Sequence, residues 1–217
     1  IEVTDDPGDT LTCTVTAADS DGGTDSASAT ALVENTNPSI ASVTVTPPSA
    51  AVGEMFTCTA VATDPDGGSP AITYSWSDGA LGSSRIVSSA TAPGETLTCT
   101  ATADDGDGGI VTATASGIVG NSNPVLSEVS ITPAAGKVDD VLTCSATATD
   151  PDGGSPTLSY VWSTGESGTT YTITSTDEPG DTITCTVTAT DLDGGSDTGS
   201  ATATIENTAP VVTGVSV

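Results

Sequence analysis

The sequence predicts an all-β chain built from tandem β-sandwich domains with an 86-residue period. The five cysteines are spaced 45, 41, 45 and 41 residues apart, so every second cysteine lies 86 residues further on. Threonine supplies 42 of the 217 residues, and its branched Cβ favours strands over helices. Short alternating segments are separated by clusters of Pro, Gly, Asp and Asn without any helical periodicity, which is typical of a sandwich.

Other landmarks recur at the same 86-residue offset, so the chain is an array of repeats. They are Trp76 and Trp162; Pro7, Pro93 and Pro179; Pro38, Pro124 and Pro210; Asn35, Asn121 and Asn207. We predict the C-terminal part of a repeat at 1–36, complete repeats at 37–122 and 123–208, and the first strand of a further repeat at 209–217. We therefore expect both ends to be cuts in a longer array.

Three alternating segments define the strands of each repeat. One runs over Thr182–Thr190, where threonines alternate with apolar residues and cysteine, and its equivalents begin at Thr10 and Thr96. Alternation at a period of two places one face inward and leaves a threonine ladder outward. The inward residues of the other two strands are Phe56, Cys58, Ala60 and Ala62, with Leu142, Cys144, Ala146 and Ala148; and Ile72, Tyr74 and Trp76, with Leu158, Tyr160 and Trp162.

The composition excludes several classes of function. Two basic residues against 29 acidic ones give a net charge of −27, whereas nucleic-acid binding needs Lys and Arg to neutralise phosphates. The chain has no histidine, the usual general base near neutral pH. No apolar stretch approaches the roughly 20 residues that span a bilayer. We predict that the chain is not an enzyme, binds no nucleic acid and has no membrane span in this segment.

The order of cysteine and tryptophan resembles the immunoglobulin-like pattern. Cys58 lies on the second strand, Trp76 follows 18 residues later on the third, and Cys99 lies on the penultimate strand. The resemblance implies a disulfide between the two sheets that packs against the tryptophan. It implies the bridges Cys58–Cys99 and Cys144–Cys185, with five buried free thiols as the alternative. A partner for Cys13 at the same spacing would precede residue 1.

A second resemblance lies around the tryptophans. The segments Tyr74-Ser75-Trp76-Ser77-Asp78-Gly79 and Tyr160-Val161-Trp162-Ser163-Thr164-Gly165 are similar to the Tyr-x-Trp-x-x-Gly segment of PKD-type domains, which are common in tandem on bacterial and archaeal surface proteins. The aspartate and phenylalanine that usually follow the tryptophan in that family are missing. The resemblance therefore places the chain among immunoglobulin-like relatives and concerns the fold more than any activity.

The motif Asp-x-Asp-Gly-Gly is the sequence feature closest to binding chemistry. It occurs five times, at Asp19–Gly23, Asp64–Gly68, Asp105–Gly109, Asp150–Gly154 and Asp191–Gly195. The copies at Asp64 and Asp150 fall between the second and third strands, and the others fall between the last two strands. Both loops emerge at the pole where the linker from the preceding repeat enters, so we expect their carboxylates to converge there.

Calcium is the cofactor that this pole suggests, because calcium takes 6 to 8 oxygen ligands from carboxylates, amides and backbone. The layout resembles cadherin-type repeats, in which calcium at the junctions stiffens a rod. The alternative is that Asp-x-Asp-Gly-Gly is simply favourable turn sequence, with aspartate capping its own turn and glycine supplying positive φ. The candidate ligands are Glu34, Asn35, Asn37, Asp64, Asp66, Asp105, Asp107, Asn121, Asn123, Asp150, Asp152, Asp191 and Asp193; the middle linker has Gly120 in place of a glutamate.

The sequence thus predicts an extracellular structural repeat protein, a rigid stalk or filament that is disulfide-locked and calcium-stiffened. Its expected location is the cell surface or a secreted filament. Its partners would be copies of itself in a fibre or neighbouring repeats of the same chain. The alternative is an adhesin or carbohydrate-binding module that binds a glycan or surface receptor. The repeats diverge most between Asp78–Ser89 and Thr164–Ser175, where one contains Arg85 and the other Tyr171.

Overall fold

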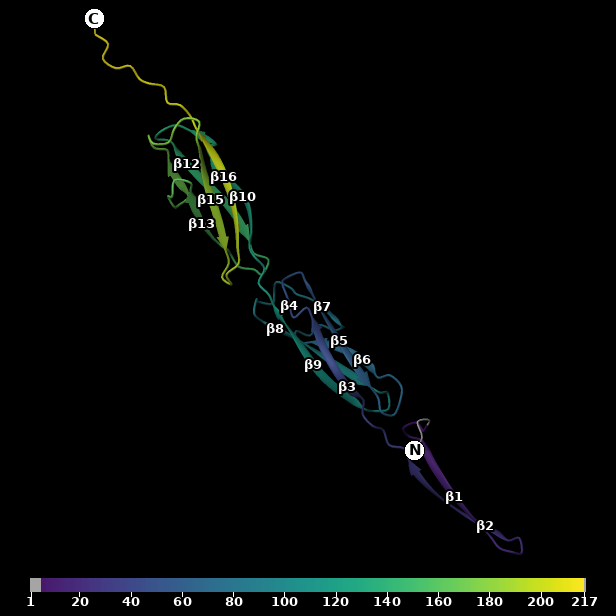
Figure 1. Ribbon diagram of the computed structural model, residues 1–217. Helices are drawn as coiled ribbons and strands as arrows, with labels where there is room; N and C mark the ends of the chain where they lie inside the picture. The colour runs from purple at the N-terminus through teal and green to yellow at the C-terminus, as the bar shows by residue number, and fades with distance from the viewer. Residues whose placement is uncertain (1–4, 217) are drawn as a thin grey trace. The chain divides into compact units, whose positions relative to one another are not determined.

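The computed structural model describes residues 5–216 and confirms the predicted all-β fold (Figure 1). No helix that is long and apolar enough to cross a membrane occurs among these residues. The chain divides into two compact units, one of the residues up to Val87 with Glu95–Val119 and the other of Ser88–Gly94 with the residues from Gly120 onward.

The first unit contains β1 (Thr10–Ala18), β2 (Thr24–Leu32), β3 (Ser39–Thr46), β4 (Ser49–Ala50), β5 (Met55–Thr63), β6 (Ala71–Trp76), β7 (Ser84–Ile86), β8 (Thr96–Asp104) and β9 (Ile110–Val119). The second contains β10 (Val125–Thr132), β11 (Ala135–Gly136), β12 (Val141–Thr149), β13 (Thr157–Trp162), β14 (Thr170–Thr172), β15 (Thr182–Thr190) and β16 (Ser196–Ile205). Strands β3–β9 lie within the predicted repeat 37–122 and β10–β16 within 123–208, and the domain boundaries themselves stay predictions.

Each complete repeat is a sandwich of a three-stranded and a four-stranded sheet. The strand orders are β3-β5-β7 with β4-β9-β8-β6, and β10-β12-β14 with β11-β16-β15-β13. All neighbours pair antiparallel except the short strands β4 and β11, which pair parallel with β9 and β16. The chain leaves the three-stranded sheet after β3 or β10, passes a cis peptide bond before Pro47 or Pro133, and joins the other sheet. The same topology is thus built twice.

Strands β1 and β2 form an antiparallel hairpin, from the pair Thr10–Leu32 to the pair Ala18–Thr24. This hairpin is the 86-residue equivalent of β8–β9 and β15–β16. Cys13 is a free, exposed thiol on β1. At the other end of the chain, residues 206–216 form no strand. Residues 1–4 and 217, which belong to the predicted partial repeats, lie outside the described residues.

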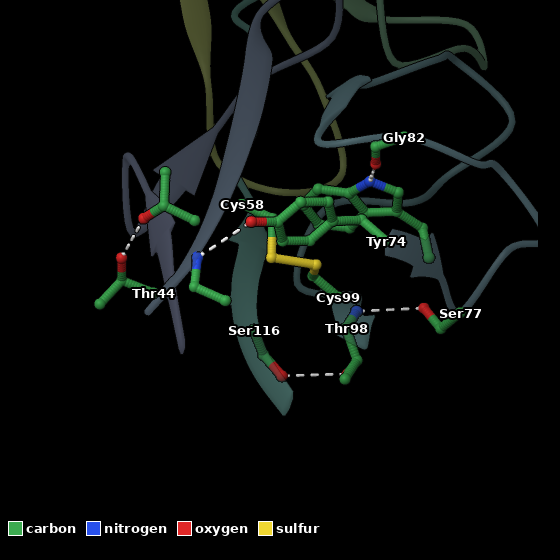
Figure 2. Close-up of a disulfide and its surroundings, with 11 residues drawn as sticks. Thr44, Cys58, Tyr74, Ser77, Gly82, Thr98, Cys99 and Ser116 are labelled. Atoms are coloured by element: carbon green, nitrogen blue, oxygen red, sulfur yellow. Dashed lines mark hydrogen bonds between the residues drawn. A yellow bond between two sulfur atoms is a disulfide. The ribbon is translucent and has the colours of Figure 1, made fainter. Parts of the chain in front are cut away.

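Both predicted disulfides are present and join the two sheets of each sandwich. Cys58 bonds to Cys99 and Cys144 to Cys185, each with a Cα–Cα distance of 6.4 Å. Figure 2 shows the first bridge beside Tyr74, whose hydroxyl oxygen accepts a hydrogen bond from the Ala60 N–H at 3.1 Å. Each bridge closes a loop of 41 residues, and such a loop stabilises the fold by roughly 4 kcal/mol on the chain-entropy model.

The tryptophans lie in the core of each sandwich, as the sequence predicts. Trp76 is 3% exposed and Trp162 is 1% exposed. Their ring N–H groups donate to backbone carbonyls, Trp76 Nε1 to Gly82 O at 3.0 Å and Trp162 Nε1 to Gly168 O at 2.9 Å. The indole polar group is therefore satisfied without leaving the core.

The core of the first sandwich has space for Phe56 because the residue that faces its ring, Gly117, has no side chain. Phe56 on β5 is completely buried and stacks on Trp76 with ring centroids 6.2 Å apart. Gly117 on β9 faces this ring so closely that an added Cβ would lie within 2.8 Å of three Phe56 carbons. The glycine is required here for space, because its φ lies outside the left-handed region.

The second sandwich fills the same space with a different set of residues. Leu142 replaces Phe56, and Ala203 replaces Gly117. The missing aromatic ring is supplied by Tyr171 on β14, which pairs with Leu142 and packs on Trp162 at a centroid distance of 5.6 Å. In the first repeat, Arg85 holds the equivalent position on β7. The sequence difference between Asp78–Ser89 and Thr164–Ser175 therefore reflects in part a difference in which side chains pack each core.

Candidate functional site

The candidate site of each repeat is the pole at which two Asp-x-Asp-Gly-Gly loops meet the incoming linker. In the first sandwich, one loop connects β5 to β6 and the other connects β8 to β9. The first aspartate of each loop caps its own turn: Asp105 Oδ1 accepts hydrogen bonds from the N–H groups of Asp107 and Gly109, both at 2.9 Å, and Asp64 Oδ1 accepts one from Asp66 N at 3.1 Å. These contacts match the turn interpretation of the motif.

The remaining carboxylate oxygens hold the linker. Asn35 donates from Nδ2 to Asp105 Oδ2 at 3.0 Å. The next residue, Thr36, donates its backbone N–H to Asp66 Oδ2. Two loops that lie about 40 residues apart in the sequence therefore bind two consecutive linker residues.

The second sandwich repeats these contacts 86 residues later. Asn121 Nδ2 donates to Asp191 Oδ2 at 3.0 Å, and Ser122 N–H donates to Asp152 Oδ2. The Ser122 hydroxyl adds a hydrogen bond to Asp152 Oδ1 at 2.9 Å. Asp191 Oδ1 and the carboxylate of Asp150 cap their own loops as before.

The last glycine of the second loop is required because the linker asparagines pack against it. A Cβ at Gly109 would overlap Asp105 Oδ2 and lie 2.9 Å from Asn37 Oδ1 and 3.0 Å from Asn35 Nδ2. A Cβ at Gly195 would lie 2.6 Å from Asn121 Nδ2 and 2.7 Å from Asn123 Oδ1. Neither glycine has a positive φ, so each is needed for space.

The linker contacts favour the charged form of the carboxylates. The amide of Asn35 lowers the pKa of Asp105 by donating to it, and the backbone N–H groups of the loop act in the same direction against the opposing effect of burial. Asn121 lowers the pKa of Asp191 in the same way. Both aspartates therefore carry full negative charge near neutral pH.

One polar atom at each pole has no partner. Asn35 Oδ1 and Asn121 Oδ1 are buried and accept no hydrogen bond, and they are the only two such side-chain atoms among the described residues. An amide oxygen is a ligand that calcium accepts. Asp107 and Asp193 lie in the same loops as Asp105 and Asp191, and within residues 5–216 their carboxylates accept no hydrogen bond. The donor types at the pole therefore fit calcium. Residues 5–216 nevertheless contain no group of three or more His, Cys, Asp or Glu side chains placed to hold a metal.

The structure thus divides the predicted ligands into three groups. Linker-binding residues are Asn35, Asp66, Asp105, Asn121, Asp152 and Asp191. Residues that pack on a glycine or cap a turn are Asn37, Asn123, Asp64 and Asp150. Residues whose side chains accept no hydrogen bond from the described part of the chain are Glu34, Asp107 and Asp193. Their role as metal ligands stays a prediction. Sequence reasoning missed the backbone N–H groups of Thr36 and Ser122, because side-chain identity carries no signal for a main-chain donor.

Comparisons with known proteins find distant structural similarity only. No family model matches the sequence, and no curated protein matches it. Solved structures with a similar fold include the N-terminal eight Ig domains of Down Syndrome Cell Adhesion Molecule isoform 1.30.30, with 16% identity over 93% of this chain and 28% of that one, at a TM-score of 0.44.

Two further structures are similar at comparable levels. Extracellular cadherin domains 3–6 of protocadherin gamma B2 show 17% identity over 92% of this chain and 59% of that one, at a TM-score of 0.39. A Ca²⁺-stabilised adhesin that helps an Antarctic bacterium bind ice shows 16% identity over 91% of this chain and 57% of that one, at a TM-score of 0.32. The chain spans less than two thirds of each of these structures. Because the identities are 16–17% and the TM-scores lie between 0.32 and 0.44, these similarities carry no argument about the role of this chain.

Proposed function

We propose that this chain is part of an extracellular structural repeat protein that forms a rigid stalk or filament. The proposal rests on the observation that both complete repeats contain the same inter-sheet disulfide and the same carboxylate contacts to the linker. Disulfides persist in oxidising compartments, which supports an extracellular location. Neighbouring repeats, and copies of the chain in a fibre, would be the partners.

The linkers support a stiff stalk because only one residue in each lies between residues that are hydrogen-bonded to the flanking strands and loops. Val33 N–H donates to Asp9 O at 2.9 Å on the hairpin side, and Asn35 is bound by the following loops, so Glu34 alone lies between them. In the next linker, Val119 N–H donates to Glu95 O at 2.8 Å and Asn121 is bound by the next loops, which leaves only Gly120. A one-residue tether has very few free backbone dihedrals.

Calcium at the poles is the second part of the proposal. Its ligands would be Asn35, with its unpartnered Oδ1, and Asp107, together with the other predicted ligands of that pole, and Asn121 and Asp193 at the next. When bound, calcium would supply positive charge to a chain with a net charge of −27. The carboxylates would otherwise repel one another, which salt screens only in part.

The calcium proposal is tested by thermal melting and small-angle X-ray scattering after chelation. Millimolar calcium should raise the melting temperature and sharpen the particle-length distribution of the chain. The double variant Asp107→Asn/Asp193→Asn should lose most of that response. The matched control is Glu166→Gln, an exposed acid at the opposite end of β13. An unchanged melting temperature and length on adding calcium would refute the calcium proposal and leave the stalk proposal standing.

The stalk proposal is tested by electron microscopy of arrays with increasing numbers of repeats. Contour length should grow linearly, by about 35–45 Å per repeat, because a strand of about 10 residues spans roughly 33 Å before its loops. Compact or randomly bent particles would argue against a stalk.

An adhesin or carbohydrate-binding module is the second candidate, favoured by one difference between the repeats. A shallow cavity of about 420 Å³ lies beside β6, lined by Ile72, Thr73, Tyr74, Ser75, Leu81 and Gly82, with Leu81 82% exposed. The second repeat has Ser167 where the first has Leu81. Binding on a glycan array that is lost in Leu81→Ser would favour this function, and absence of binding would exclude the glycan version of it.

A further inference from the structure

We infer that the paired loops form a clasp that fastens the linker to its sandwich without any metal ion. The clasp of the first repeat consists of Asp66, Asp105 and Gly109, which hold Asn35 and Thr36. That of the second consists of Asp152, Asp191 and Gly195, which hold Asn121 and Ser122. The inference does not depend on calcium, and it gives the Asp-x-Asp-Gly-Gly loops a role of their own.

The clasp is closed entirely by protein groups. Asp105 uses Oδ1 for the N–H groups of its own loop and Oδ2 for the amide of Asn35. Asp66 accepts the Thr36 N–H. Hydrogen bonds to a charged carboxylate are stronger than those between neutral groups. These hydrogen bonds therefore orient the two carboxylates without a cation, while both keep their negative charge.

Among residues 5–216, no hydrogen bond joins the Asp19–Gly23 loop of the β1–β2 hairpin to a linker. There, Asp19 Oδ1 accepts hydrogen bonds from Asp21 N at 3.0 Å and Gly23 N at 2.7 Å, the same self-capping contacts as in the other loops. The loop therefore adopts its shape on its own. One carboxylate oxygen is left over in this arrangement, and in the complete repeats that oxygen receives the asparagine amide.

The contacts also assign different roles to the two aspartates of each motif. In the loop after β8, the first aspartate, Asp105, binds the linker, and the third-position Asp107 does not. In the loop after β5, the third-position Asp66 binds the linker, and Asp64 only caps the turn. Loss of Asp66 or Asp105 should therefore free the linker, whereas loss of Asp107 should leave it held. A calcium site would predict a strong effect of Asp107.

The test is amide hydrogen exchange of the whole chain in excess chelator, resolved by NMR. The Thr36 and Ser122 amides should exchange at least about tenfold more slowly than in an unstructured peptide. Asp66→Ala should return Thr36 to the unstructured rate while Ser122 stays protected. Asp107→Ala is the control that should change neither amide. Protection of the β8 amides in each variant shows that the sandwich remains folded.

Two results of this first experiment would overturn the clasp. One is exchange of Thr36 and Ser122 at the unstructured rate in chelator with the β8 amides protected. The other is protection that appears only after calcium is added, or that Asp107→Ala removes. A second variant, Asn35→Asp, places a carboxylate against Asp105 and should release Thr36 in chelator by like-charge repulsion; retained protection would contradict the inference. None of these outcomes depends on the melting response to calcium, so the two proposals fail separately.

Discussion

Adding one methyl group at Gly117 should destabilise the first sandwich, and removing part of Phe56 should rescue it. The added Cβ of Gly117→Ala would lie within 2.8 Å of three carbons of the Phe56 ring, well inside van der Waals contact. The ring is fully buried and packed on Trp76, so it has no free space to move into. The second sandwich accepts alanine at the equivalent Ala203 because Leu142 replaces the ring.

The magnitude follows from the cost of overpacking a close-packed core, which is about 1–3 kcal/mol. Phe56→Leu alone leaves a cavity, because Arg85 does not supply the ring that Tyr171 supplies in the other repeat, and large-to-small core changes of this size cost roughly 1–2 kcal/mol. In the double variant, the methyl group added by Gly117→Ala occupies part of that cavity. The two changes should therefore be non-additive by about 1–2 kcal/mol in the stabilising direction.

The assay is native-state hydrogen exchange of the whole chain, read by mass spectrometry on peptides from β8 and from β15. The β8 peptide reports the free energy of unfolding of the first sandwich, and the β15 peptide of the second is the internal control. Gly117→Ala should lower protection of β8 only, and Phe56→Leu/Gly117→Ala should recover much of it. Additive effects, or a neutral Gly117→Ala, would refute the volume argument.

Three further predictions follow from the disulfides, the linker contacts and the last loop glycine. The variant Cys144→Ala/Cys185→Ala should lose about 4 kcal/mol of stability in the second sandwich, measured by denaturant unfolding, with the first sandwich unchanged. The pKa values of Asp105 and Asp191 lie below their ordinary value of 3.8 because linker amides donate to them. The stability that the two charged aspartates give the fold is present above that value and is lost as the pH falls through their lower folded pKa values. An acid titration of the free energy of unfolding should therefore show a loss of stability, and the loss should be smaller in Asn35→Ala/Asn121→Ala. Gly195→Ala should expose the Ser122 amide to hydrogen exchange, because the added Cβ overlaps the linker asparagines. Gly194→Ala should destabilise the turn instead, because Gly194 has a φ of 95°. Equal effects of the two variants on Ser122 exchange would contradict the argument that Gly195 is needed for space.

The features that could be predicted from the sequence are those with a strict period. Alternating threonines and apolar residues located the long strands, and the resemblance of Cys58, Trp76 and Cys99 to the immunoglobulin-like pattern located the disulfide. The short strands β4 and β7 could not be predicted, because two or three residues carry no recognisable alternation. Their positions depend on tertiary pairing with β9 and β5.

The location of the candidate site could be predicted from the sequence, but its individual hydrogen bonds could not. The recurrence of Asn35 and Asn121 with the acidic loops located the pole, because loops between known strands must emerge at a known end of a sandwich. The sequence could not show which oxygen binds which donor. Asp105 binds its own loop with one carboxylate oxygen and the linker amide with the other, and this division depends on backbone geometry. The fit of the Phe56 ring against Gly117 also depends on backbone geometry, because the two residues lie on different strands.

The measurement that tests the central claim most directly is a pulsed electron paramagnetic resonance distance between the two complete repeats. Non-thiol spin labels at Thr112 on β9 and Thr198 on β16, exposed positions 86 residues apart, would report the distance distribution across the linker. A rigid stalk with a one-residue tether predicts a single narrow distribution in the presence of calcium. A broad distribution like that of two domains on a flexible linker would contradict it.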